Sequence, residues 1–87
     1  MKNITFEEAK EIIKKISPKY NRVTTYKKCY VFYYDDESGV IRDGGYGAPK
    51  GVVIETGEVM TMARLVARGI VNHKEKIAEG QKIDLSK

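Results

Sequence analysis

The chain has 87 residues, 41% of them hydrophobic, and a formal net charge of +4 at pH 7. This length fits one small domain, residues 1–87, whose stability margin is thin because a short chain buries little of its surface. No apolar run approaches the roughly 18 residues that a membrane span needs, and residues 1–5 lack the apolar core of a signal peptide. We therefore expect a cytoplasmic protein.

The first expected element is an amphipathic helix over residues 5–17. Thr5 and Glu8 have the spacing of a capping box, in which each side chain accepts a hydrogen bond from the other residue's backbone amide. Pro18 ends the helix, because the residue before a proline is pushed out of the α region. The apolar residues between these signals follow helical spacing and form one stripe: Phe6, Ala9, Ile12, Ile13 and Ile16.

A strand is expected over residues 26–34, where aromatic and β-branched side chains replace the helical pattern. Residues 19–25 are more polar and predict a connection, with at most a short extended start at Val23. The pattern predicts a central strand that the N-terminal helix covers on one face and another element covers on the other. If the second face is open, its aromatic side chains form a binding surface. The two apolar faces are Cys29, Val31 and Tyr33, and Tyr30, Phe32 and Tyr34.

The middle of the chain predicts turns and a second pair of strands. An acidic turn at 35–39 and a short strand segment at 40–42 precede a glycine-rich loop at 44–51. Residues 52–55 and 58–61 then predict a tight hairpin around the Thr-Gly turn.

The last expected element is a helix over residues 61–79, because apolar residues again recur at helical spacing. Thr61 would cap this helix and Gly80 would end it, and a break at Gly69 into two shorter pieces is the alternative. Residues 81–87 are expected to be loosely docked or frayed. The elements together predict an α+β fold, a small antiparallel sheet of three or four strands packed against the N-terminal helix, in the order α-β-β-β-α.

The glycine-rich loop suggests a phosphate site, but its order of residues does not match the standard phosphate-binding loops. Lys50 precedes Gly51, which reverses the order of the P-loop, and a strand rather than a helix follows. Backbone amides beside Lys50 could still form an anion nest. A nucleotide- or small-molecule-binding protein is therefore the second hypothesis.

The sequence favours neither catalysis nor metal binding. Cys29 is the single cysteine and lies in an apolar run, so we expect a buried thiol rather than a reactive one. His73 is the single histidine and is expected on a helix face at the core boundary. One cysteine and one histidine make a zinc site improbable. We expect a protein that is not an enzyme and has no cofactor or metal.

A contact surface is the favoured function for the middle of the chain. Tyr46 lies within the glycine-rich loop and is expected to be an exposed anchor for a protein partner. Interspersed basic residues leave nucleic-acid binding through basic helices as a third hypothesis. A homodimer would bury apolar surface that the small fold leaves open. The predicted binding residues are Asp35, Asp36, Gly44, Gly45, Tyr46, Gly47 and Lys50.

Four short motifs carry a family resemblance over residues 5–62. They are Cys29-Tyr30-Val31-Phe32-Tyr33-Tyr34, Gly44-Gly45-Tyr46-Gly47-Ala48-Pro49, Val52-Val53-Ile54 and Thr56-Gly57-Glu58-Val59. This part of the chain resembles the YrhB-like immunity-protein family and small proteins encoded by phages and mobile elements. The tryptophan usual in that family's aromatic strand is absent here. The resemblance implies a non-enzymatic, immunity-like or inhibitor protein that binds another macromolecule, such as a toxin.

Overall fold

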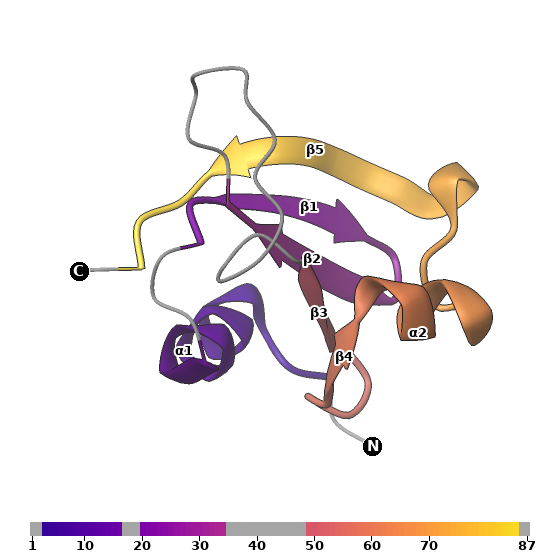
Figure 1. The fold of residues 1–87 in the computed structure, drawn as a ribbon, viewed down its shortest axis with the longest axis horizontal. Coiled ribbons are helices and arrows are strands. Elements are labelled where there is room, and N and C mark those ends of the chain that lie inside the picture. Colours follow the sequence, from indigo (N-terminus) through magenta and orange to yellow (C-terminus); the bar gives the residue numbers. More distant parts are fainter. Residues whose placement is uncertain (1–2, 17–19, 35–48, 86–87) are drawn as a thin grey trace.

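The structure is a computed structural model that describes residues 3–16, 20–34 and 49–85. These residues form an antiparallel sheet and an N-terminal helix that packs against it, which confirms the expected α+β class (Figure 1). In chain order the elements are α1 (Phe6–Ile16), β1 (Arg22–Tyr26), β2 (Cys29–Tyr33), β3 (Lys50–Val53), β4 (Val59–Thr61), α2 (Met62–Ala67), the 3₁₀ helix η1 (His73–Glu75) and β5 (Lys76–Lys82).

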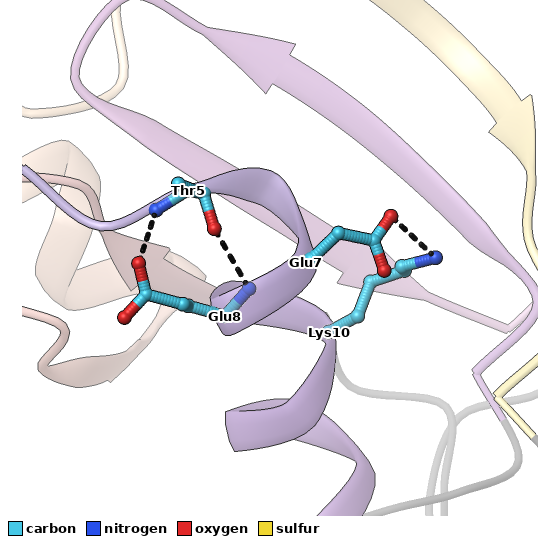
Figure 2. A network of polar contacts seen from close by, with 4 residues as sticks. All are labelled: Thr5, Glu7, Glu8 and Lys10. Atoms are coloured by element: carbon cyan, nitrogen blue, oxygen red, sulfur yellow. Dashed lines mark hydrogen bonds and ion pairs between the residues drawn. The ribbon is translucent and has the colours of Figure 1, made fainter.

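Helix α1 begins with the expected capping box (Figure 2). The Thr5 amide donates to Glu8 Oε1 at 3.0 Å, and the Glu8 amide donates to Thr5 Oγ1 at 3.1 Å. These bonds satisfy amides that the first turn of a helix leaves without an intrahelical partner. In the next turn Lys10 Nζ pairs with Glu7 Oε1 at 3.1 Å. The helix therefore starts one residue later than expected, for the expected reason.

The sheet has the order β4-β3-β2-β1-β5, and every neighbouring pair is antiparallel. The aromatic strand β2 is central, as its two apolar faces predict. Its Val31 lies opposite Thr24 of β1 and Gly51 of β3. The expected hairpin is also present, because Val52 of β3 pairs with Val59 of β4 across the turn at Gly57. Strand β5 forms the far edge beside β1 (Figure 1).

Helix α1 covers one face of the sheet. The Phe6 ring lies 5.2 Å from the Tyr30 ring and 6.4 Å from the Phe32 ring, measured between centroids. Phe32 is fully buried beneath the helix, and its aromatic neighbours extend the apolar contact. The buried residues of this cluster are Ala9, Ile13, Tyr20, Val23, Phe32, Val52 and Leu85. We call this side the α1 face.

The opposite face, which we call the α2 face, carries a second cluster. Alternation along the strands sends Val31 and Gly51 to this side while Phe32 and Val52 point to α1. Leu65 of α2 is fully buried against the sheet. The buried residues here are Tyr26, Cys29, Val31, Val53, Met60 and Leu65. Both faces of the central strand are therefore covered.

The prediction of a polar connection at residues 19–25 was wrong. Residues 22–26 form β1, which pairs with β2 from Arg22 opposite Tyr33 to Thr25 opposite Tyr30. Val23 is fully buried and Thr24 is buried although it is polar. The β-branched residues of this segment suit a pleated surface, and tertiary burial outweighs their polarity. With β1 and β5 included, the described residues form a sheet of five strands rather than three or four.

The expected long helix over 61–79 was also wrong. Thr61 does cap a helix, because its Oγ1 accepts from the Arg64 amide at 3.4 Å, but α2 ends at Ala67. Gly69 has a φ of 70° and its amide donates to the Val66 carbonyl, while the Ile70 amide donates to the Leu65 carbonyl. These two bonds make a Schellman motif, which ends the helix. The alternative prediction, in which the helical segment is interrupted at Gly69, is therefore confirmed at that position.

The chain beyond Gly69 contains no second long helix in its described part. Residues 76–82 form β5, which runs antiparallel to β1 with two register shifts. Gly80 lies inside this strand rather than at a helix end, and His73 is exposed in η1 rather than at the core boundary. The expected loose end at 81–87 was wrong for 81–85, since Leu85 is buried in the cluster beneath α1.

Candidate functional site

Of the seven predicted binding residues, the described part of the chain contains only Lys50. The other six, Asp35, Asp36, Gly44, Gly45, Tyr46 and Gly47, lie outside the described residues, as do the expected acidic turn and the segment at 40–42. Lys50 is half-buried at the start of β3, opposite Phe32 on one side and Thr61 on the other. The structure therefore places Lys50 in the sheet itself.

Gly51, at the end of the glycine-rich loop, has a packing role. A Cβ built on this residue would overlap Leu65 Cδ1 and lie 3.5 Å from the Tyr30 carbonyl oxygen. Only glycine therefore lets the fully buried Leu65 side chain lie directly on β3. Packing against Leu65 therefore explains the glycine at this position without a bound phosphate.

A cleft of about 350 Å³ opens at the opposite end of β3, beside the turns at this end of the sheet. Lys50 is three residues away along the strand from Val53, or about 10 Å. We call this opening the sheet-end cleft. Its lining residues are Asn3, Lys27, Lys28, Val53, Ile54, Glu55, Thr56, Glu58, Met60, Arg68 and Ile70. Its volume lies at the small end of the range of about 300–1,000 Å³ that is typical of ligand pockets.

Backbone hydrogen bonds hold the segments around the sheet-end cleft together. The Ile54 amide donates to the Lys28 carbonyl at 2.9 Å, which ties the β3–β4 turn to the β1–β2 turn. The Ile4 amide donates to the Ile54 carbonyl at 2.8 Å, and the Lys27 amide donates to the Glu75 carbonyl at 3.0 Å. The side chains that line the cleft therefore project from a fixed frame, which lowers the entropic cost of binding.

The Schellman motif that ends α2 adds the last part of the lining. It turns the chain at Gly69, so that Arg68 and Ile70 both line the cleft although α2 has only six residues. Ile70 packs against the buried cluster of the α2 face. The nearly buried Val53 and Met60 belong to the same cluster, so the floor of the cleft is apolar.

Five charged side chains surround this apolar floor. The cations come from the β1–β2 turn and the end of α2, whereas the carboxylates come from the β3–β4 turn. All five are exposed, and none of them makes an ion pair with another described residue. They are Lys27, Lys28 and Arg68 on the basic side, and Glu55 and Glu58 on the acidic side. Each charge is therefore available to a ligand.

Two titratable side chains of the α2 face, Cys29 and Tyr26, are buried within its cluster. Cys29 is fully buried, and this burial raises the pKa of its thiol to about 11. The thiolate is the nucleophilic form, so the free thiol is unsuited to covalent chemistry near neutral pH. Burial also raises the pKa of Tyr26. The expectation of a buried cysteine is confirmed.

Both a metal-binding cluster and a membrane-spanning helix are absent from the described residues. They include no group of three or more His, Cys, Asp or Glu side chains placed to hold a metal ion. In residues 3–16, 20–34 and 49–85, no helix has the length and apolar character that crossing a membrane requires.

Comparison with known proteins adds no relative to this picture. No family model, no curated protein and no solved structure matches the chain.

The sequence-based predictions missed the sheet-end cleft because two of its three charged segments were misassigned. The β1–β2 turn at residues 27–28 falls inside the strand that the sequence predicts over 26–34, and Arg68 falls in the middle of the predicted long helix. One available signal was the pair Lys27–Lys28 between two β-rich runs, since two polar residues between such runs are typical of a hairpin. The proximity of Arg68 to that turn depends on tertiary structure and has no local signal.

Proposed function

We propose that this protein is a non-enzymatic interaction protein of the inhibitor or immunity-like type, which binds a protein partner at the sheet-end cleft. One observation carries the proposal: five exposed charges, none in an ion pair with another described residue, line an apolar floor on a hydrogen-bonded frame. Protein interfaces combine an apolar centre with a polar rim in this way. The resemblance to immunity proteins supports the same class of function.

The cleft alone is too small to be a complete stable interface. Specific protein interfaces bury about 800 Å² on each partner. We therefore propose the cleft as the centre of a larger contact surface. Lys50, at the other end of β3, and Tyr46, which lies outside the described residues, remain sequence-predicted contacts for the same partner.

Partner capture from the natural host, compared across matched variants, tests this function. Arg68→Glu reverses a charge of the cleft, Lys15→Glu reverses an exposed charge on α1, and Tyr46→Ala removes the predicted anchor. We expect quantitative mass spectrometry to find a protein that the parent and Lys15→Glu retain and that Arg68→Glu loses. Loss with Tyr46→Ala as well would add the glycine-rich loop to the interface.

Two results would contradict the proposal. In the first, capture by Arg68→Glu equals capture by Lys15→Glu, which would mean that the cleft is not the contact. In the second, no protein is enriched while a nucleotide raises the melting temperature of the chain, because a ligand that binds the native state stabilises it. That outcome would favour the nucleotide-binding hypothesis.

A further inference from the structure

We infer that the sheet-end cleft binds a short polypeptide segment in which an apolar side chain lies between an acidic and a basic one. This inference rests on the proposed function and names the chemistry of the partner. In this arrangement the apolar side chain contacts the floor formed by Val53, Met60 and Ile70, while the two charged side chains meet opposite charges of the rim.

The division of the rim charges by segment is the first argument. The basic side consists of Lys27, Lys28 and Arg68, and the acidic side belongs wholly to the β3–β4 turn. The β3–β4 turn is stiffened by Thr56, whose Oγ1 accepts from the Glu58 amide at 3.2 Å. Charges of opposite sign therefore come from separate segments of the lining, and a ligand that carries both signs can pair with both.

The floor supplies the second argument. Val53 and Met60 are 8% and 5% exposed, so they present little apolar surface, and Ile70 is only half-buried. Together with the 350 Å³ volume, this small floor suits a side chain or two rather than a helix or a second domain. A segment of extended chain fits such an opening, because alternate side chains of a strand point the same way.

The acidic side argues against a polyanion as the ligand. Nucleic-acid sites are strongly and uniformly positive because they neutralise successive phosphates. Here Glu55 and Glu58 lie in the same lining as Arg68, and would repel phosphate groups placed there. A ligand with charges of one sign therefore meets repulsion on one part of the rim, whichever sign it carries.

The test is a titration of the isotope-labelled chain with synthetic peptides, followed by NMR. The first peptide carries an aspartate, a leucine and a lysine at alternate positions, separated by glycines, so that the three side chains point the same way in an extended chain. The matched peptides replace the leucine with serine, the lysine with aspartate, or the aspartate with lysine. We expect the mixed-charge peptide to shift the amide signals of residues 27–28, 53–60 and 68–70. The serine peptide should bind with an affinity lower by up to about tenfold.

Charge-reversed variants sharpen the test. Each exposed ion pair contributes little, so Arg68→Glu should weaken the mixed-charge peptide about two- to fivefold, and Glu58→Lys should do the same. Arg68→Glu should also bind the peptide in which lysine replaces aspartate more tightly than it binds the mixed-charge peptide. Lys15→Glu on α1 is the control and should leave every affinity unchanged. All these positions are exposed, so circular dichroism should report an unchanged fold.

Several results would overturn the inference. Equal affinity for all peptides, shifts confined to other residues, or stronger binding of an oligonucleotide at the cleft would each contradict it. Concentration-dependent shifts without peptide would assign the cleft to a second copy of the chain. If no peptide binds while partner capture is still lost with Arg68→Glu, the proposed function stands and the inference about the ligand falls.

Discussion

The two faces of the sheet are closed by very different means. The α1 face lies under an eleven-residue helix that begins with a capping box, and Leu85 from the other end of the described chain completes its cluster. The α2 face lies under a six-residue helix whose Leu65 needs Gly51 beneath it. The short helix leaves the end of the sheet uncovered, and the sheet-end cleft is found there.

This difference suggests a division of roles between the faces. The α1 face buries large aromatic and aliphatic side chains and should carry most of the stability. The α2 face is covered less fully, and its open end carries charges that make no ion pair with another described residue. The following predictions test whether the two faces differ in this way, beginning with the largest expected effect.

Phe32→Ala should cause the largest loss of stability. Phe32 is fully buried beneath α1, and removing a buried phenylalanine side chain costs about 3–5 kcal/mol through lost burial and the cavity left behind. Urea denaturation gives the free energy of unfolding. Ile16→Ala on α1 is the control. Ile16 is 47% exposed, so its truncation should lower the free energy of unfolding much less. Similar losses in both variants would show that the α1 face does not carry the stability assigned to it.

Gly51→Ala should destabilise the α2 face by about 1–3 kcal/mol, because the added methyl group overpacks against Leu65. The double variant Gly51→Ala, Leu65→Ala provides the control. In the Leu65→Ala background the same methyl group enters space that the shortened side chain has vacated, so its added cost should be close to zero. An equal cost in both backgrounds would locate the strain elsewhere, for example at the Tyr30 carbonyl.

Stability should fall between pH 9 and pH 11 because of Cys29. Burial raises the pKa of its thiol from 9.0 to about 11, so the native state holds a proton that the unfolded state releases. This contribution is complete below pH 9 and is lost as the pH rises, by about 3 kcal/mol in total.

The measurement for this prediction is urea denaturation across the pH range, with Cys29→Ala as the reference. Burial raises the pKa of Tyr20 and Tyr26 too, so both proteins lose stability in alkali, and the difference between the two slopes isolates the thiol. Parallel slopes would rule out a raised thiol pKa in the native state.

The smallest expected effects compare the two helix caps. Thr5→Ala removes a hydrogen bond of 3.1 Å and one half of a capping box, and should cost about 1 kcal/mol. Thr61→Ala removes a single, longer bond of 3.4 Å from a six-residue helix and should cost only a few tenths. Thermal unfolding followed by circular dichroism checks the order. A larger loss with Thr61→Ala would mean that the α2 face depends on its cap more than the α1 face does.

The local sequence predicted those elements whose determining residues lie within a few positions of one another. Thr5 and Glu8 determine the start of α1, and the alternating apolar faces of β2 predict a central strand covered on both sides. The turn at Gly57 likewise follows from adjacent residues. The α+β class could therefore be predicted, because it depends on periodicity and capping, which act over a few residues.

Tertiary structure alone decided the features that bring distant segments together. The helical apolar spacing of residues 62–77 extends to the start of residues 76–82, yet this segment forms β5, because β1 presents an edge whose hydrogen-bonding groups need partners. Arg68 lines the same cleft as Lys27 and Lys28 only because Gly69 ends α2 beside the β1–β2 turn. The sequence by itself thus determined which segments are helical or extended near strong local signals. The cleft depends on packing between segments some 40 residues apart, which no local pattern encodes.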